Sequence, residues 1–372
     1  MINLKLLDIS TTRIKDIQSI SYLKSLKELY MDDCAYIVSL EPISFLELDV
    51  LSINSCIGLI SIHDIRLMKS LKVLNLNGYH RITDLYSIRF LTNLLSLSLK
   101  ECTKLTNIDG LQNLQLLENL NIYGCNSLQN IDVLFSLTHI KTIEAGGCSR
   151  IRNMEGNVNL KYLDNVSLEG IPLITDIDFL HRIPNIKSLN LKLCSSLYSI
   201  AGLFSLDCLS DLDISSCYSI SDLHPLGTLK QLKKLNLSHC GSIATIEDIS
   251  FLKNLEHLTM DQCVKVFDFS PLSQLLRLKS ISMQNSKVED LEFCTGLVNL
   301  EILILNHSES LADTSGLIGL NKLKSLSLRF CVKLRSLECI STLTSLNFLD
   351  IGHCPKLAAE HLHEISNIQI KI

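Results

Sequence analysis

Cysteine is the reactive residue type that this sequence uses most regularly. The chain has 372 residues and 14 cysteines, and eleven of these recur at one position of a repeating segment, here called the ladder position. The ladder cysteines are Cys34, Cys56, Cys102, Cys125, Cys148, Cys194, Cys217, Cys240, Cys263, Cys331 and Cys354. A thiolate is a nucleophile and a metal ligand. Zinc sites, however, need ligands clustered at spacings such as C-x₂₋₄-C, and the sequence has no such pair. The regular spacing instead favours a structural role, because a thiol is a small apolar side chain with a weak donor.

Disulfide formation is the other chemistry open to these thiols. Thiols from successive segments would stack near disulfide distance, but they would point the same way and would be buried. We therefore expect free thiols, which in this number favour a reducing compartment. The ladder position of the other five segments is filled by Thr12, Tyr79, Ile171, Ser286 and Ser308. Cys208 and Cys339 fall at variable positions, and we expect both to be accessible.

Patterns for other chemistry are scarce. The sequence has no Gly-rich phosphate loop, no H-E-x-x-H and no G-x-S-x-G. His361 and His363 form an H-x-H close to His353. Residues two apart on a helix point in different directions, so a metal site is not favoured there. We expect no catalytic residue, no metal and no cofactor, and hence a protein that is not an enzyme.

The cysteines belong to a unit of 22 or 23 residues that occurs sixteen times. In the unit from Leu117 to Leu137, the pattern L-x-x-L-x-L places Leu120 and Ile122 on one face of a short strand. After Cys125 the apolar residues recur every third position, which suits 3₁₀ turns or extended segments. This change of period inside a unit of constant length is typical of a solenoid. We expect a single solenoid domain over residues 1–372, with a long parallel sheet on its concave side.

Two regions depart from the pattern. The seventh repeat has Ala145 and Asn157 at apolar positions, with Gly146, Gly147 and Gly156 nearby, and in the eighth repeat Ile171 and Pro172 take the place of the Cys turn. A locally degenerate pair of repeats is the simpler interpretation, and the alternative is a hinge or a bare patch where the backbone of a partner approaches closely. At the other end, residues 355–372 predict a short helix and then a strand, which together would cap the exposed core.

The repeat resembles the leucine-rich repeat family over essentially the whole chain. The family pattern L-x-x-L-x-L-x-x-N/C-x-L stands here as LKELYMDDCAYI from Leu26, LLSLSLKECTKL from Leu94 and LKKLNLSHCGSI from Leu232. The resemblance implies an α/β-type solenoid, wound as a right-handed superhelix with short 3₁₀ or extended convex segments, and a protein that binds other proteins. Cysteine at the ladder position of 23-residue units is similar to repeat proteins of trypanosomatid expression sites, described as adenylate cyclase regulators. Plant resistance-protein repeats also carry Cys there. The RING-like zinc segment of the trypanosomatid proteins has no counterpart in this sequence.

Charge and hydropathy narrow the classes of partner. The net charge is −5 and the isoelectric point is about 6.1, which argues against nucleic acid as the main partner. No apolar run reaches the roughly 18 to 20 residues of a membrane helix. The first residues, MINLKLLDISTTRIKD, lack the basic and apolar regions of a secretion signal. We expect a monomer in the cytoplasm.

The outward positions of the strands are the remaining candidates for function. Most of them carry small polar residues, which solvation of an open sheet face alone requires. Larger or charged residues are the expected contacts for a protein partner, namely Tyr30, Asp32, Lys100, Tyr123, Glu169, Lys192, Asp211, Asp213, Asp261 and Arg329. Tyr and Arg carry binding energy when a partner encloses them. Over all outward positions of all the strands there are nine acidic and four basic residues, so we expect a partner with a polar, somewhat basic surface.

These observations leave two functions of different classes to compare. The first is a protein-interaction scaffold or regulatory subunit that binds its partner on the concave face. The alternative is an extracellular or surface recognition module or adhesin, against which the free ladder cysteines and the missing secretion pattern speak.

Overall fold

The structure, a computed structural model, describes residues 3–152, 160–357 and 369–371. It divides into two compact units, Met1–Ile174 and Thr175–Ile372, which we call the N-terminal and C-terminal units. The expectation of a single domain over residues 1–372 therefore stays a prediction. The helix expected after Leu357 lies outside the described residues, as do Gly156 and Asn157.

The N-terminal unit consists of short parallel strands separated by 3₁₀ helices. Each strand pairs with the next one along the chain in an unbroken register, for example Leu97 with Leu120. The strands are β1 (Leu6–Asp8), β2 (Glu28–Tyr30), β3 (Val50–Ser52), β4 (Val73–Asn75), β5 (Ser96–Ser98), β6 (Asn119–Asn121), β7 (Thr142–Glu144) and β8 (Asn165–Ser167). The 3₁₀ helices are η1 (Gln18–Tyr22), η2 (Glu41–Ile43), η3 (His63–Leu67), η4 (Ile88–Phe90), η5 (Asp109–Asn113) and η6 (Asp132–Ser136).

The C-terminal unit repeats this arrangement. Its strands are β9 (Ser188–Asn190), β10 (Asp211–Asp213), β11 (Lys234–Asn236), β12 (His257–Thr259), β13 (Ser280–Ser282), β14 (Ile302–Ile304), β15 (Ser325–Ser327), β16 (Phe348–Asp350) and β17 (Gln369–Lys371). Its 3₁₀ helices are η7 (Asp178–Arg182), η8 (Ala201–Ser205), η9 (His224–Thr228), η10 (Glu247–Phe251), η11 (Ser270–Gln274), η12 (Glu292–Cys294), η13 (Ser315–Leu317) and η14 (Glu338–Thr342). The last strand, β17, pairs in parallel with β16.

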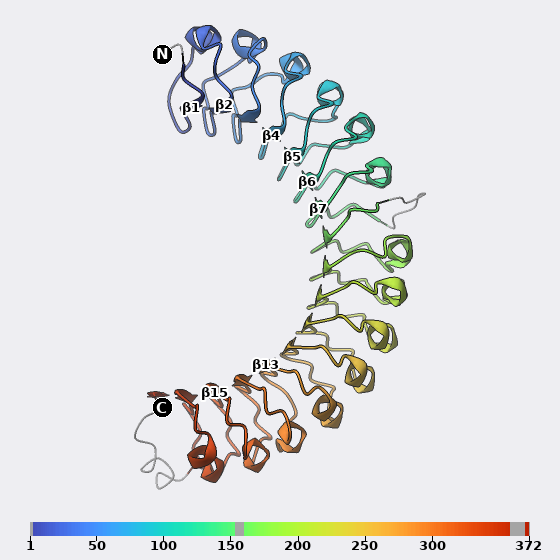
Figure 1. Ribbon diagram of the computed structural model, residues 1–372, viewed down its shortest axis with the longest axis vertical. Coiled ribbons are helices and arrows are strands. Elements are labelled where there is room, and N and C mark those ends of the chain that lie inside the picture. The colour runs from blue at the N-terminus through green and yellow to red at the C-terminus, as the bar shows by residue number, and fades with distance from the viewer. Residues whose placement is uncertain (1–2, 153–159, 358–368, 372) are drawn as a thin grey trace. The chain divides into compact units, whose positions relative to one another are not determined.

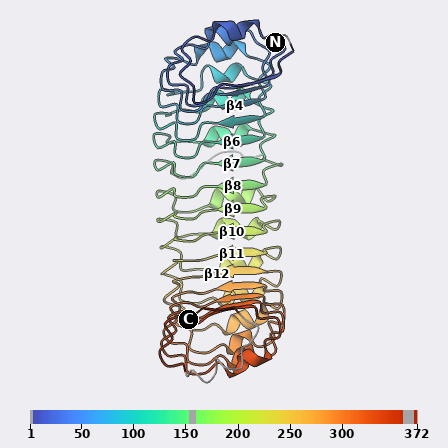
Figure 2. The ribbon, with the colours of Figure 1, turned by 90° about the vertical axis from the view of Figure 1, so that its left-hand side faces the viewer.

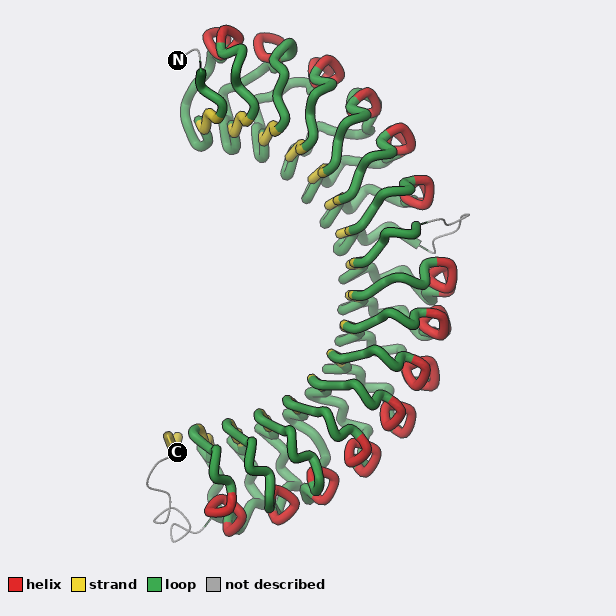
Figure 3. The backbone as a smooth tube through the Cα atoms, viewed as in Figure 1, coloured by secondary structure: helices red, strands yellow, loops and turns green. Residues whose placement is uncertain are grey.

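Within each unit the strands line the inner, concave side and the 3₁₀ helices lie on the outer side (Figures 1 and 3). Figure 2 shows successive strands of a unit lying side by side. The described residues contain short 3₁₀ helices and no α-helix. The predicted fold class, a solenoid with a parallel sheet and short 3₁₀ turns, is confirmed.

The core follows the two periods of the sequence. In the strand of the sixth repeat Leu120 is 2% exposed and Ile122 is fully buried, as their alternation predicts. Behind them Leu128, Ile131 and Leu134 are buried at a spacing of three, along an irregular segment that leads into η6. Each repeat thus buries both halves of its apolar pattern against the repeats on either side.

A tight turn follows each strand and directs the ladder position inward. The residue just before the ladder position has a positive φ, whether it is a glycine such as Gly124 (73°) or a bulky residue such as Leu193 (62°) or Phe330 (60°). For a non-glycine residue this left-handed conformation is unfavourable by about 1 kcal/mol or more. The turn recurs through the array, so the geometry and not the residue type determines this conformation.

The ladder thiols donate hydrogen bonds to backbone carbonyls of the preceding repeat. Cys217 donates to the oxygen of Leu191 and Cys240 to that of Ile214, each at 3.1 Å. Burial raises the pKa of Cys240 to about 11 and that of Cys102 to about 12, so both remain neutral donors. All cysteines are free. The structural interpretation of the ladder is confirmed.

The accessible cysteines differ in part from expectation. Cys208 is exposed, as predicted. The prediction for Cys339 is wrong, because this side chain is 4% exposed and its thiol donates to Thr314 Oγ1 of the preceding repeat at 3.2 Å.

Candidate functional site

The concave face of each unit is built from three outward positions per repeat. These are the first and third residues of a strand and the second residue after it, as in Asp211, Asp213 and Ser215, of which the short Ser215 side chain is buried beneath its neighbours. The middle residue of that strand, Leu212, is 3% exposed and faces the core. Alternation of side chains along a strand thus fixes which residues can meet a partner.

Many polar residues of this face also hold the backbone. The backbone N–H of the second residue after a strand donates to a side-chain oxygen instead of to a strand carbonyl. Asp213 Oδ1 accepts the N–H of Ser215 in its own repeat at 2.8 Å. Asp261 Oδ1 instead accepts the N–H of Gln284 in the next repeat at 2.7 Å. These two carboxylates, both predicted contact residues, are therefore held in one orientation.

The N-terminal unit carries Tyr30 and Asp32 on and just after β2. The hydroxyl of Tyr30 donates to Glu28 Oε2 at 3.0 Å, and burial together with this carboxylate raises the pKa of Tyr30. Asp32 Oδ1 accepts the Ser52 hydroxyl at 2.7 Å and the N–H of Asn54 at 2.8 Å. Both predicted residues are half-buried, and each is fixed by neighbours on the same face.

Tyr123 and Lys100 come together around the glycines of the seventh repeat. The ammonium nitrogen of Lys100 lies 5.5 Å from the centre of the Tyr123 ring. A Cβ placed on Gly146 would stand 3.0 Å from Tyr123 Cδ2, so this ring lies against the Gly146 backbone. The same Cβ would be 2.9 Å from the carbonyl oxygen of Glu169. Tyr123 therefore covers Gly146 and lies close to Gly147, and both interpretations of this irregular region stay predictions.

Two carboxylates lie beside this aromatic contact. Burial raises the pKa of Glu144, on β7, and the nearby charge of Glu169 raises it further, although the Ser167 hydroxyl acts in the opposite direction. Glu169, a predicted contact residue, is half-buried two residues after β8. The face of the N-terminal unit thus combines, over β5 to β8, a phenol ring, an ammonium group and two carboxyl groups.

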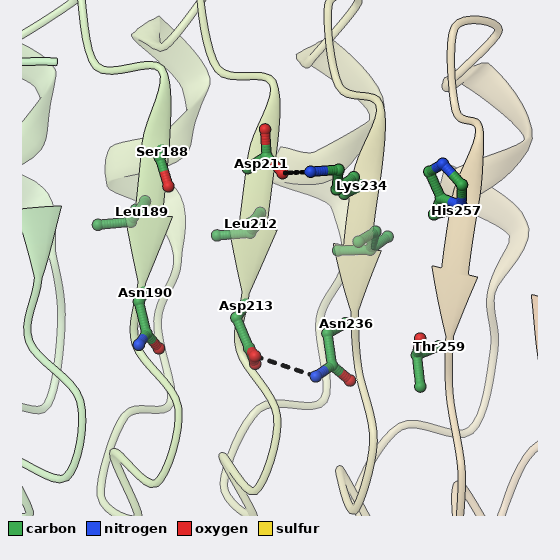
Figure 4. Close-up of a pocket in the computed structure, with 11 residues that line it drawn as sticks. Ser188, Leu189, Asn190, Asp211, Leu212, Asp213, Lys234, Asn236, His257 and Thr259 are labelled. Carbon is green, nitrogen blue, oxygen red and sulfur yellow. Dashed lines mark hydrogen bonds and ion pairs between the residues drawn. The ribbon is translucent and has the colours of Figure 1, made fainter. Parts of the chain in front are cut away.

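The C-terminal unit has a pocket of about 370 Å³ on its concave face, which we call the β9–β12 pocket (Figure 4). It is lined by Ser188, Leu189, Asn190, Asp211, Leu212, Asp213, Lys234, Leu235, Asn236, His257 and Thr259. Of the predicted contact residues, Asp211 and Asp213 lie in it. His257 was missed, although it occupies the same strand position as Asp211 and Lys234 in the next repeat.

Polar pairs cross the β9–β12 pocket from strand to strand. Lys234 Nζ lies 3.0 Å from Asp211 Oδ1, and Asn236 Nδ2 donates to Asp213 Oδ2 at 3.0 Å (Figure 4). The Lys234 side chain is 64% exposed, so water screens this ion pair and makes it easy to exchange. The two carboxylates and the one ammonium group of the lining sum to a charge of −1.

The other predicted contacts of this unit lie on neighbouring parts of the same face. Lys192 is half-buried, and its N–H donates to Asn190 Oδ1 at 3.0 Å. Arg329 follows β15, with its guanidinium carbon 5.2 Å from the centre of the Phe330 ring. Its N–H donates to Asn306 Oδ1 at 2.9 Å. The structure brings Tyr123 to Lys100 and Asp211 to Asp213, while Lys192, Asp261 and Arg329 occupy separate repeats.

The described part of the chain has neither a metal-binding cluster nor a membrane-spanning helix. Nowhere in residues 3–152, 160–357 and 369–371 do three His, Cys, Asp or Glu side chains gather in a way that could hold a metal ion. None of the helices described there has the length and apolar character needed to cross a membrane. The pair His361 and His363 lies outside these residues.

Comparison with solved structures shows the same solenoid in bacterial proteins. A leucine-rich repeat protein of Leptospira interrogans is 19% identical with a TM-score of 0.78, and the match covers 100% of this chain and 96% of that one. The internalin InlF of Listeria monocytogenes is 23% identical with a TM-score of 0.61, covering 82% and 81%. The functional domain of InlJ from Listeria monocytogenes, which includes a cysteine ladder, is 18% identical with a TM-score of 0.58, covering 94% and 73%. At these identities the likeness shows the fold alone.

Comparison of the sequence with protein families gives the repeat type. No curated protein matches the sequence, and the resemblance to trypanosomatid repeat proteins stays a prediction. The family model for the BspA type leucine-rich repeat region matches in six copies, within residues 29–143, 80–198 and 123–244. Together these matches cover more than half of the 372 residues. The chain therefore belongs to the BspA-type leucine-rich repeat family.

Proposed function

We propose that this protein is a non-enzymatic scaffold or regulatory subunit that binds a protein partner on its concave face. The observation that carries the proposal is the seating of Tyr123, whose ring lies against Gly146 with the ammonium of Lys100 5.5 Å from its centre. An aromatic side chain that is already held in place loses little conformational entropy on binding. Solenoids of this kind use their concave surfaces for binding.

The charge of the face supports a partner with a polar, somewhat basic surface. In the β9–β12 pocket the net charge is −1, and Glu144 and Glu169 lie beside Tyr123 on the N-terminal unit. Complementary charge directs association and selects partners more than it adds affinity. The proposed partner is a protein, with no nucleic acid and no membrane insertion.

The proposed location is the cytoplasm, and the proposed state is a monomer. Free ladder thiols support a reducing compartment. A second candidate, a surface recognition module or adhesin, is favoured by one observation: the functional domain of InlJ also includes a cysteine ladder. A disulfide-free cysteine ladder in the protein isolated from its source would support the first location.

A pull-down from lysate of the source cells tests the proposal. The bait is the wild-type chain beside a variant with alanine at Tyr30, Lys100, Tyr123 and Arg329. A matched control replaces two tyrosines, one lysine and one arginine outside the concave positions: Tyr22, Tyr86, Lys69 and Arg277. We expect a partner that the wild type and the control retain and that the concave variant loses, with unchanged circular dichroism. A partner retained by the concave variant and lost by the control would overturn the proposal.

A further inference from the structure

An apolar ridge stands on the concave face of the C-terminal unit, four strands away from Asp211. It consists of Ile302 and Ile304, the two outward residues of β14. Ile302 is 38% exposed, whereas Leu303 between them is fully buried and supplies the core contact of this strand. Folding of the repeat therefore does not require the apolar character of the two outward residues.

Serines surround this apolar ridge. In the strand register, Ile302 stands between Ser280 and Ser325, and Ile304 stands between Ser282 and Ser327. Because serine is much shorter than isoleucine, both isoleucines project above their neighbours. An exposed apolar contact of this shape with a polar surround is the arrangement found where a partner buries a large apolar side chain.

The carboxylates of the β9–β12 pocket provide a second, charged contact. Asp213 is held by Ser215 N–H on one oxygen and by Asn236 Nδ2 on the other, which leaves each oxygen a further lone pair for an incoming donor. Asp211 is paired to Lys234, a side chain exposed enough to move aside. A lysine or arginine side chain from a partner matches this site in charge and in donors.

The distance between the two contacts sets the length of the segment that could reach both. From β10 to β14 there are four strand spacings in an unbroken register, or about 19 Å at ~4.8 Å per spacing. An extended chain advances about 3.3 Å per residue, so about six residues cover this distance. Side chains alternate along an extended chain, so residues i and i+6 face the same way.

We propose that the concave face of the C-terminal unit binds an extended segment of its partner in which a basic and a large apolar side chain are six residues apart. The basic side chain contacts Asp211 and Asp213, and the apolar one packs on Ile302 and Ile304. This inference rests on the proposed function and specifies the chemistry of the partner.

Fluorescein-labelled synthetic peptides test the spacing directly. One pair carries Arg and Leu separated by five small residues, in both orders, and the matched pair has the same composition with four small residues between them. In anisotropy titrations with the full chain, we expect the better six-apart peptide to bind about tenfold more tightly than its five-apart counterpart. The shorter spacing turns one of the two side chains away from the sheet.

Variants of the protein locate the bound peptide. Asp211→Asn with Asp213→Asn keeps the side-chain shape and one acceptor oxygen on each residue but removes both charges. It should weaken binding of the Arg–Leu peptide and remove most of its salt dependence. Ile302→Ser with Ile304→Ser copies the neighbouring strands and should weaken it about tenfold. The matched controls are Asp207→Asn, at an exposed turn, and Ile318→Ser, at a side chain that is 60% exposed, and both should bind like the wild type.

Several results would overturn the inference. Equal affinity for the two spacings, no binding up to about 1 mM, or full binding by both double variants would each do so. Self-association that the isoleucine variant abolishes and the peptides do not reverse would assign the ridge to a second copy of this chain. In each case a partner lost by the Tyr30, Lys100, Tyr123 and Arg329 variant would still uphold the proposed function, so the two failures are distinguishable.

Discussion

The ring of Tyr123 lies against the backbone of Gly146. A Cβ at Gly146 would stand 3.0 Å from Tyr123 Cδ2 and 3.1 Å from Cε2, closer than side chains in folded proteins normally approach. The φ angle of Gly146 is not positive, so space and not backbone conformation makes this residue a glycine. The glycine at this outward position of the seventh repeat is thereby explained by the seating of one concave-face ring.

Replacing Gly146 by alanine should displace Tyr123 and destabilise the protein. The methyl group would meet the ring and the Glu169 carbonyl oxygen, 2.9 Å away, and overpacking of this kind costs about 1–3 kcal/mol. Urea unfolding followed by circular dichroism measures the change. Gly241→Ala is the control, because no atom lies within 4 Å of its added Cβ. Equal midpoints for the two variants would show that Tyr123 is not seated on Gly146.

Alkylation of the native protein should label one cysteine rapidly. Cys208 is exposed, Cys354 is half-buried, and the other twelve thiols are buried and free. Burial raises the pKa of the ladder thiols, that of Cys263 to about 12, which suppresses the reactive thiolate. Mass spectrometry after a short treatment with iodoacetamide should show one adduct, absent from Cys208→Ser. Rapid labelling of several ladder cysteines would contradict the buried ladder.

Cys240→Ala should lower stability by about 1–2 kcal/mol. The mutation removes the thiol that donates to the Ile214 oxygen at 3.1 Å and leaves a small void in a fully buried position. Denaturant midpoints measure it, with a check that the slope is unchanged. Cys208→Ala, at an exposed site, should stay within about 0.5 kcal/mol of the wild type. A Cys240 variant as stable as the Cys208 variant would remove the structural role of the ladder.

Glu144→Gln should stabilise the folded protein at neutral pH. Burial raises the pKa of Glu144 in the folded state above 4.5, so the folded protein binds the proton more tightly than the unfolded chain. The stability of the wild type therefore falls as the pH rises from 4.5 through the folded-state pKa, and the neutral glutamine avoids that loss. Because the group is partly solvated, the gain is less than about 1 kcal/mol.

Thermal melts between pH 4 and pH 7 test this sign. The two proteins should melt together at the acid end and separate as the pH rises, with the variant higher. Asp313→Asn serves as a control of opposite sign, because the Ser315 hydroxyl lowers the pKa of that carboxyl. Because that pKa is lowered from 3.8, this variant should already be less stable than the wild type at pH 4 and should stay so up to pH 7, with the gap closing only at more acid pH. If the melting temperatures of Glu144→Gln and the wild type changed in parallel with pH, burial would not raise the pKa of Glu144.

The sequence predicts the fold well because the apolar spacing within each repeat determines the local structure of that repeat. Leu120 and Ile122 at a spacing of two assign the strand, and Leu128, Ile131 and Leu134 at a spacing of three assign the segment that leads into η6. The ladder role of Cys240 follows from spacing in the same way. Cys339 could not be placed, since its burial depends on Thr314 in the preceding repeat, at a position without a fixed period.

The candidate surface could be predicted only in part. Outward positions follow from alternation, so Asp211 and Asp213 were found. The orientation of such carboxylates could not be predicted. Asp213 accepts the N–H of Ser215 in its own repeat, whereas Asp261 accepts the N–H of Gln284 in the next repeat. The seating of Tyr123 on Gly146 likewise depends on the distance between two repeats, which the residues of one repeat do not contain.

Site-specific photo-crosslinking tests the central claim, that the concave face is where the partner binds. Benzoylphenylalanine replaces Tyr30 or Tyr123 on the concave face and, as matched aromatic controls, Tyr22 in η1 or Tyr86 just before η4. The account predicts that irradiation of the complex in source lysate joins the same partner to positions 30 and 123 and leaves it free with positions 22 and 86. Crosslinks confined to positions 22 and 86 would place the binding site on the convex side and contradict the account.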